Sequence, residues 1–341
     1  MKKIKVGIIG AGRIGKVHAL SITNQMPYVQ IAYVSDYFEK AANELADTLE
    51  GCRAVKDYHD ILNDPEVDAV LICSSTDTHA TISIDAARAG KHIFCEKPID
   101  LDVNKIKEVI QTVEKAGVKY QVGLNRRFDK NFKAIKDAVD AGKIGDVHVV
   151  KITSRDPEPP SIDYIKSSGG LFLDMTIHDF DMVRYLVNSE VTEVYAVGKC
   201  LVDPKIEEAG DVDTAIITLK FENDAVGVID NSRRAEYGYD QRAEVFGSKG
   251  AIAISNEAPS NAVLSTKEGI MAEKPLHFFL ERYMQAYQDE MIQFLNAIIN
   301  NTDTPVIIND GLQSVIIGLA AKKSVQEGRP VLIQEIIDEY Q

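Results

Sequence analysis

A glycine-rich segment close to the start of the chain constrains the fold more than any other part of the sequence. An apolar run, Ile4–Ile9, is followed at once by the pattern Gly10-x-Gly12-x-x-Gly15. Gly10 permits a tight turn, Gly12 lets the backbone approach a pyrophosphate, and Gly15 lets a helix pack closely on the strand. Phosphates would accept hydrogen bonds from the unpaired N–H groups of that helix, which we expect to begin near Arg13. The segment therefore predicts a strand, a turn and a helix that bind a dinucleotide.

An acidic residue stands where such a nucleotide-binding unit places its ribose ligand. The run 30–35 is typical of a second strand and ends directly before Asp36, about 20 residues after the last glycine of the pattern. Asp36 can accept hydrogen bonds from both ribose hydroxyls and would repel a 2′-phosphate, which favours NAD over NADP. Tyr37 and Phe38 supply no cation for that phosphate, and Lys40 is the nearest one. A structural βα turn with a surface Asp is the alternative interpretation.

Strand-like and helix-like runs alternate from Asp36 to Gly123. Helices are expected at 39–49, 76–89 and 103–116, and strands at 67–73, 91–95 and 119–123. This alternation predicts right-handed βαβ units in a doubly wound parallel sheet, whose ligands bind beyond the carboxyl ends of the strands. The polar residues after those strands are therefore site candidates: Ser74, Ser75, Thr76 and His79, then Glu96, Lys97 and Pro98, and finally Asn125, Arg126 and Arg127.

The second half of the chain has a different pattern of β-like runs and short polar turns. Strands are expected at 147–153, 193–201, 214–221, 225–232, 242–246 and 251–255, one helix at 171–187 between them, and further helices at 132–141, 278–300 and 311–326. We therefore predict an α/β chain with a Rossmann domain at 1–124 and an α+β domain at 125–341, built on a large open, mostly antiparallel sheet. The C-terminal helices could pack back on the first domain.

Composition and charge narrow the classes of partner. The chain has 341 residues and a net charge of −14, which argues against nucleic acid or an acidic membrane surface as a partner. Its four cysteines form no C-x-x-C pair, so neither a structural zinc site nor a disulfide framework is expected. No signal-type segment precedes the first strand and no run is long enough to cross a membrane. These features predict a cytoplasmic protein with a small-molecule partner.

Three residues are candidates for a catalytic role. Asp174 and His178 lie four apart, which on a helix places both side chains on one face. A carboxylate beside an imidazole raises its pKa and orients its ring, as a general base for an alcohol proton requires. Lys97, at a strand's carboxyl end, could hold a substrate hydroxyl and stabilise the alkoxide as it forms. A surface pair and a solvated lysine are the alternatives; a metal site with Asp179 and Asp181 is disfavoured, since Asp179 would point away from the other ligands.

Together these motifs resemble the Gfo/Idh/MocA oxidoreductases over essentially the whole chain. The markers are the glycine pattern, Cys95-Glu-Lys97-Pro98, Gly123-Leu-Asn-Arg-Arg-Phe128 and Asp174-x-x-x-His178. Within the family the chain looks most like the inositol 2-dehydrogenases, through Ser154-Arg-Asp-Pro157, Leu173-Asp-Met-Thr-Ile-His-Asp-Phe-Asp181 and Tyr237-Gly-Tyr-Asp-Gln-Arg-Ala-Glu-Val-Phe-Gly247.

The resemblance implies roles for particular residues. Lys97, Asp174 and His178 would form the catalytic set, with His178 taking the hydroxyl proton and Pro98 in a cis bond. Cofactor binding would involve Gly10, Gly12, Arg13, Ile14, Gly15, Asp36, Ser74, Ser75, Thr76, His79, Glu96, Lys97 and Arg126. The polyol would contact Arg126, Asp156, Asp181 and Tyr237 as well as the catalytic set, although these four could equally be structural polar residues. Some inositol dehydrogenases carry His and Asn where this chain has Ser154 and Asp156, which leaves the inositol isomer open.

The activity that these expectations describe is an NAD-dependent oxidation. We expect one secondary hydroxyl of a cyclic polyol, foremost myo- or scyllo-inositol, to be converted to the ketone of an inosose by hydride transfer. The resemblance also implies a homotetramer assembled through the open sheet. A dehydrogenase of another sugar or sugar alcohol is one alternative. A non-catalytic NAD-binding regulator is another, and the joint presence of Lys97, Asp174 and His178 argues against it.

Overall fold

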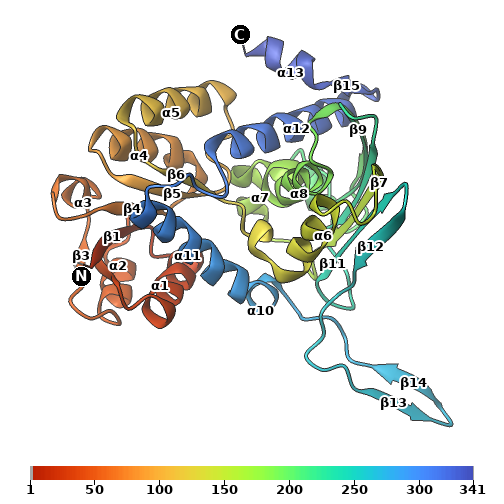
Figure 1. Ribbon diagram of the computed structural model, residues 1–341, viewed down its shortest axis with the longest axis horizontal. Coiled ribbons are helices and arrows are strands. Elements are labelled where there is room, and N and C mark those ends of the chain that lie inside the picture. The colour runs from red at the N-terminus through yellow and green to blue at the C-terminus, as the bar shows by residue number, and fades with distance from the viewer. Residues whose placement is uncertain (1–2, 341) are drawn as a thin grey trace. The chain divides into compact units, whose positions relative to one another are not determined.

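The chain forms two compact units that do not follow one another simply along the sequence. The computed structural model describes residues 3–340. The first unit comprises the chain up to Phe128 together with Gln285–Val315, and the second comprises Asp129–Met284 and the residues from Ile316 onward. In Figure 1 the blue helix α11 (Met284–Asn300) accordingly lies among the red and orange elements of the first unit.

A six-stranded parallel sheet forms the centre of the first unit. Its strands are β1 (Ile4–Ile9), β2 (Val29–Ser35), β3 (Arg53–Val55), β4 (Ala69–Ile72), β5 (His92–Glu96) and β6 (Tyr120–Gly123). They run in the order β3-β2-β1-β4-β5-β6, and every pair of neighbours is parallel. The order reverses between β1 and β4, and ligands of such sheets bind at this point, beyond the carboxyl ends of the strands. The predicted doubly wound sheet is thus confirmed.

The helices of the first unit follow from caps and apolar spacing. They are α1 (Arg13–Gln25), α2 (Glu39–Ala46), α3 (His59–Asn63), α4 (Thr76–Arg88), α5 (Val103–Ala116), the 3₁₀ turn η1 (Asn125–Phe128) and α11. Helix α5 has a typical capping residue at each end. Asp102 caps its start by accepting from Asn104 N at 2.8 Å, and Gly117 ends it with a φ of 66°. The buried core joins strand residues such as Val6 and Phe94 to Phe294 of α11.

A seven-stranded mixed sheet forms the centre of the second unit. Its strands are β7 (Val147–Arg155), β8 (Val191–Lys199), β9 (Thr214–Phe221), β10 (Val226–Ser232), β11 (Asp240–Gly247), β12 (Gly250–Ile254) and β15 (Val331–Leu332). The order is β12-β11-β7-β10-β9-β8-β15, and only the β7–β10 pair is parallel within the described residues. The alternation of buried and exposed residues along β9 shows that one face of the sheet is covered and the other open. The expected mostly antiparallel open sheet is confirmed.

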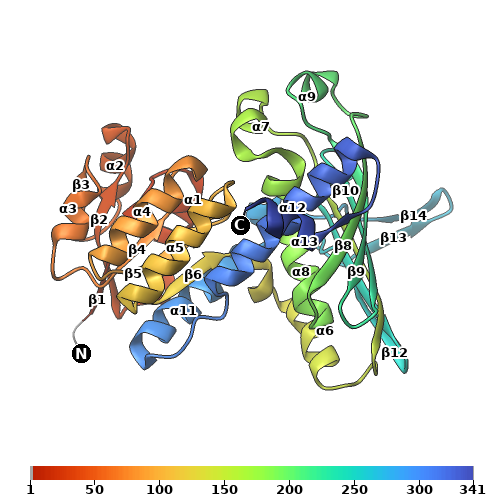
Figure 2. The ribbon, with the colours of Figure 1, turned by 90° about the horizontal axis from the view of Figure 1, so that it is seen from above.

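Helices cover one face of this sheet. The helices of the second unit are α6 (Lys130–Asp140), α7 (Ile162–Ser168), α8 (Ile177–Val187), α9 (Pro204–Glu208), α10 (Phe279–Arg282), α12 (Ile308–Glu327, which continues from the first unit) and α13 (Ile333–Glu339). Figure 2 shows α6 and α8 on the same side of the sheet. A separate hairpin of β13 (Val263–Thr266) and β14 (Gly269–Ala272) extends from β12. Among residues 3–340, no helix combines the length and the apolar character that crossing a bilayer requires.

Three expectations about helices in the second half are wrong. Two further helices, α7 and α9, lie between the strands, and their caps Ser161 and Asp203 were visible in the sequence. The expected helix at 278–300 is broken at Tyr283, where the chain turns so that Arg282 makes a two-point ion pair with Asp129, at 2.5 and 3.1 Å. The expected helix at 171–187 begins as a π-helical turn, Leu171–Met175, because Thr176 N–H donates to Leu171 O five residues back.

Candidate active site

The three glycines of the first loop differ in what surrounds them. Gly10 has a φ of 108°, and a Cβ there would lie 2.5 Å from the Cys73 carbonyl. A Cβ on Gly15 would lie 2.0 Å from Gly10 O, whereas a Cβ on Gly12 would meet nothing within 4 Å. The turn and the close helix–strand contact therefore exclude side chains at Gly10 and Gly15. Gly12 instead faces open space that a phosphate group could use.

The start of helix α1 offers backbone donors to an anion. Its N-cap residue is Gly12, with no side-chain cap and no acidic residue in the first turn. Arg13 is the exposed first residue of the helix, and Ile14 is half-buried behind it. The N–H groups of this turn and the positive end of the helix dipole suit a pyrophosphate. The loop therefore fits the dinucleotide that the sequence predicts.

Asp36 is held in place beside this loop. Its Oδ2 accepts from Ala11 N at 2.7 Å and its Oδ1 accepts from Phe38 N at 2.8 Å. These two bonds fix the carboxylate at the carboxyl end of β2, and each oxygen keeps a further lone pair for a ribose hydroxyl. A negative charge in this position would oppose a 2′-phosphate.

The loop after β4 begins helix α4. Ser74 Oγ lies 2.7 Å from Thr78 Oγ1, Ser75 is the N-cap, and Thr76 is the first helical residue. His79 lies one turn into the helix and is only 2% exposed. Its Nδ1 is 2.7 Å from Pro98 O and its Nε2 is 3.1 Å from Ser74 O. His79 thus joins the loop after β4 to the loop after β5.

Lys97 directly follows the last residue of β5, and its bond to Pro98 is cis, as expected. Glu96, the residue before it, accepts from His18 Nε2 at 2.7 Å. Arg126 lies in η1 after β6 and is 3% exposed. The expected residues of the first unit thus gather at the carboxyl ends of β1, β2, β4, β5 and β6, the edge where ligands of such sheets bind.

Sequence reasoning missed a buried acid beneath this edge. Glu290 on α11 is fully buried, and neither of its carboxyl oxygens has a hydrogen-bond partner among residues 3–340. Burial, and after it the negative charge of Glu96, raises the pKa of Glu290 well above its ordinary value. Both effects favour the neutral form of the Glu290 carboxyl group. The apolar period of α11 gave no sign of it, because one acid at a core position looks like any surface acid in sequence.

A buried arginine brings together two of the expected residues in the second unit. Arg233, which follows β10, is 3% exposed. Its Nη1 donates to Asp156 Oδ2 at 3.2 Å and its Nη2 to Asp174 Oδ2 at 3.1 Å. Burial lowers the pKa of Arg233, but the charges of Asp174 and Asp156 raise it above its ordinary value, so the guanidinium stays charged. Its place directly after a strand was a signal that sequence reasoning did not use.

Asp174 lies in the π-helical turn and not in the α-helix that carries His178. Its Oδ1 accepts from Tyr164 Oη at 2.9 Å, while Oδ2 receives Arg233. His178 is the second residue of α8 and is half-buried. The two residues therefore do not share one regular α-helix, because a wider π-helical turn precedes α8. A contact between Asp174 and His178 stays a prediction.

Helix α8 is tied to the sheet through polar contacts of its own. Asn231 Nδ2 donates to Asp179 Oδ2 at 3.0 Å, and Thr176 Oγ1 donates to Asn231 Oδ1 at 2.7 Å. Asp179 thus has a structural partner on β10. Asp181 lies on the same helix and is 1% exposed. These contacts hold the segment that contains His178 against the closed face of the sheet.

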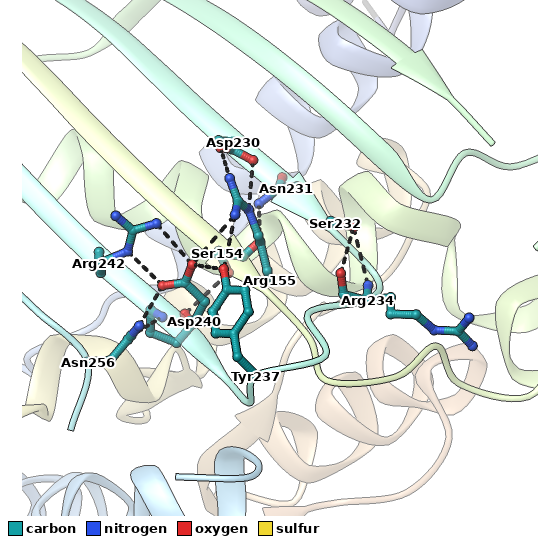
Figure 3. A network of polar contacts seen from close by, with 11 residues as sticks. Ser154, Arg155, Asp230, Asn231, Ser232, Arg234, Tyr237, Asp240, Arg242 and Asn256 are labelled. Carbon is teal, nitrogen blue, oxygen red and sulfur yellow. Dashed lines mark hydrogen bonds and ion pairs between the residues drawn. The ribbon is translucent and has the colours of Figure 1, made fainter. Parts of the chain in front are cut away.

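Tyr237 belongs to a different set of contacts (Figure 3). Its hydroxyl donates to Asp240 Oδ2 at 2.5 Å and accepts from Arg155 Nη1 at 3.0 Å. Arg155 also pairs with Asp230, and Asp240 with Arg242. Burial, and then the bond to Asp240, raises the pKa of Tyr237. Figure 3 shows the hydroxyl of Tyr237 pointing into this charged network, so any role of Tyr237 toward a polyol stays a prediction.

The fold and this site define a dinucleotide-binding oxidoreductase with a separate sheet unit. The family description "Oxidoreductase family, NAD-binding Rossmann fold" matches residues 4–124, and the description "GFO/IDH/MocA C-terminal domain" matches residues 132–253. The chain belongs to the Gfo/Idh/MocA family of oxidoreductases, with an NAD-binding Rossmann domain.

Several proteins match this chain over nearly its full length. An uncharacterized oxidoreductase of Bacillus subtilis is 52% identical over 98% of this chain and 97% of its own length. The myo-inositol 2-dehydrogenase of Thermotoga maritima is 49% identical over 98% of this chain and 100% of its own length. The scyllo-inositol dehydrogenase of Lactobacillus casei, solved with bound NAD(H) and scyllo-inositol, is 32% identical over 98% of this chain and 100% of that one, with a TM-score of 0.91.

Proposed function

We propose that this protein oxidises one secondary hydroxyl of an inositol, myo- or scyllo-, to the corresponding 2-keto inosose with NAD as the hydride acceptor. The observation that carries the proposal is the full-length similarity to a protein named myo-inositol 2-dehydrogenase. The polar residues of both units support it. An uncharged polyol must be recognised by several donors and acceptors together, and Asp156, Asp174 and Arg233 provide them in one buried set.

The proposed roles follow from the chemistry of each group. When bound, the nicotinamide supplies the acceptor for the hydride that leaves the carbinol carbon. His178 removes the hydroxyl proton, and Asp174 supports it as a neighbouring negative charge. Lys97 donates to the substrate oxygen and stabilises its developing negative charge. Arg126, Asp156 and Asp181 bind the other hydroxyls.

A substrate panel tests the proposal. Formation of NADH is measured with NAD and myo-, scyllo- or chiro-inositol, or glucose. We expect kcat/KM for one inositol to exceed that for glucose by at least about tenfold, because hydroxyls that do not match leave site groups without partners. A preference for glucose would instead make the protein a sugar dehydrogenase. Tight NADH binding without turnover of any polyol would favour the non-catalytic regulator.

We also propose that copies of the chain associate through the open face of the second sheet. Large apolar side chains lie on that face, with exposures of 38–49%: Tyr195, Val197, Ile216, Val226 and Phe246. Such a patch on a sheet is typical of an interface. Light scattering coupled to size-exclusion chromatography should give the mass of a tetramer, and a monomer would contradict this proposal.

A further inference from the structure

Two buried histidines from different helices contact the chain on either side of Lys97. His18 on α1 lies with its Nε2 2.7 Å from Glu96 Oε1, the side chain before Lys97. His79 on α4 lies with its Nδ1 2.7 Å from Pro98 O, the carbonyl after Lys97. Their exposures are 0% and 2%. All of these residues belong to the first unit.

The His18 ring has a defined orientation. A carboxylate only accepts, so Nε2 carries the proton that bonds to Glu96. The Nδ1 atom of His18 has no hydrogen-bond partner among residues 3–340. Phe94 meets the ring at 69° with 4.9 Å between centroids, and Tyr287 meets it at 83° with 5.7 Å. The two aromatic rings therefore keep the imidazole aimed at Glu96.

The His79 ring has two backbone acceptors and must donate from both nitrogens. Its Nε2 lies 3.1 Å from Ser74 O, opposite the bond to Pro98 O. Burial lowers the pKa of His79, but the neighbouring Cys95 sulfur and the two carbonyls raise it by more, to about 9. At neutral pH the ring is therefore an imidazolium that makes both bonds at once.

We propose that His18 and His79 are positioning residues that hold the two neighbours of Lys97, through the Glu96 side chain and the Pro98 carbonyl, and so direct its ammonium group. The inference rests on the proposed function, in which Lys97 binds the substrate oxygen. Proline has no N–H group, so the carbonyl is the one backbone hydrogen-bonding group of Pro98. His79 then acts through that carbonyl and not through the cofactor. Displacement of a reacting group by about 1 Å can cost about a hundredfold in rate, so such a clamp has a measurable effect.

Matched substitutions test each contact separately. The amide nitrogen of Gln can take the place of Nε2, and that of Asn the place of Nδ1. His18→Gln keeps the bond to Glu96 and His18→Asn loses it, whereas His79→Asn keeps the bond to Pro98 O and His79→Gln loses it. We expect kcat to fall at least about tenfold further in His18→Asn and His79→Gln than in their partners, with KM for NAD within about threefold of wild type.

A control separates this effect from general damage to the strand. His92 lies at the opposite end of β5, where its Nδ1 accepts from Lys119 N at 3.0 Å. His92→Asn retains an acceptor near that atom and should leave kcat unchanged. Equal losses of kcat for the Gln and Asn variants at either histidine would overturn the proposal. So would a loss that appears in KM for NAD alone.

A second readout does not depend on the substrate. Acetic anhydride labels lysines, and peptide mass spectrometry gives the rate at Lys97 relative to exposed Lys105. The relative rate should change at least about threefold in His18→Asn and His79→Gln and stay constant in their partners. An unchanged rate in all four variants would contradict the clamp. If the wild-type protein oxidises no polyol, the proposed function fails, while the labelling still decides whether the histidines position Lys97.

Discussion

Arg233 Nη2 donates to Asp174 Oδ2 at 3.1 Å inside the second unit, while Nη1 of the same guanidinium holds Asp156. Arg233→Met would leave the two buried carboxylates facing each other without a cation. We expect the free energy of unfolding to fall by about 3–5 kcal/mol and kcat/KM for the polyol to fall by at least about a hundredfold. Urea unfolding and steady-state kinetics measure the two effects. Exposed Arg234 offers the matched control, since Arg234→Met should change neither.

Lys97→Met should abolish turnover without removing the cofactor site. The substitution keeps most of the side-chain length but removes the ammonium that would stabilise the developing alkoxide. We expect kcat to fall by at least about a thousandfold and the Kd of NADH to stay within about threefold. Stopped-flow kinetics and NADH fluorescence titration give the two values. Turnover at the wild-type rate in this variant would contradict the proposed role of Lys97.

Alanine at two glycines of the first loop should affect two different properties, cofactor binding at Gly12 and stability at Gly15. A Cβ at Gly12 meets nothing within 4 Å, so Gly12→Ala should fold normally but weaken NADH binding by at least about tenfold, by filling space that the phosphates would use. A Cβ at Gly15 would lie 2.0 Å from Gly10 O, so Gly15→Ala should lower the melting temperature. Calorimetry and NADH titration distinguish them. Equal loss of stability in both variants would show that Gly12 is structural.

Asp36 should determine the choice of cofactor. Its carboxylate is fixed by Ala11 N and Phe38 N. Asp36→Ser removes the charge that opposes a 2′-phosphate, so the ratio of kcat/KM for NAD to that for NADP should fall by at least about tenfold. Lys40→Gln serves as a control for the nearest cation and should leave NAD kinetics unchanged. A wild-type preference for NADP would overturn the assignment.

The buried acid Glu290 should make the free energy of unfolding depend on pH. Burial removes water from its carboxyl group, and Glu96 of β5 is the negatively charged neighbour that raises its pKa. The other groups around this part of the unit are His18 of α1, Cys73 after β4, Gln121 of β6 and Tyr287 on its own helix. Gln121 Nε2 donates to the backbone carbonyl of Glu290 at 3.1 Å, so the Gln121 side chain lies beside the turn of α11 that carries Glu290. Ionisation of Glu290 would place a second negative charge beside Glu96.

The sign of the effect follows from the raised pKa of Glu290 in the folded chain. Its stabilising contribution is complete below the unfolded pKa, about 4.3, and is lost as pH rises toward the folded value. Glu290→Gln removes this loss, so the variant should gain up to about 1.4 kcal/mol per pH unit over wild type between pH 5 and the folded pKa. Chemical denaturation at several pH values measures it. Asp289→Asn, the same change on the less buried neighbour, should give a constant difference.

Much of the first unit could be predicted because its signals are local. The glycine pattern, the helix from Val103 to Ala116 with its Asp and Gly caps, and the residues after each strand all depend on neighbours in sequence. The alternation of strands and helices predicted that the sheet is parallel, but the order of its strands and the short strand β3 were not predicted. The ends of strands differ from expectation by one or two residues, since backbone pairing and not side-chain pattern decides them.

The missed features depend on contacts between distant segments. Arg233 is functionally interesting only because Asp156 and Asp174 lie 77 and 59 residues away from it in sequence. The π-helical turn before α8 forms where Thr176 also bonds to Asn231 of a neighbouring strand. The placement of Tyr237 among Arg155 and Asp240 follows from pairing of β7 with β11. No local pattern encodes these relations.

The return of the chain to the first unit has a consequence for biosynthesis. Met291, Phe294 and Leu295 complete a core whose other members are translated more than 190 residues earlier, Phe94 being the last of them. A nascent polypeptide leaves the ribosome from its N-terminus, so the glycine loop and its sheet emerge long before their hydrophobic complement. A fragment that stops at Phe128 should therefore behave as a loosely packed intermediate, and maturation of the nucleotide pocket should wait for the last sixth of the polypeptide.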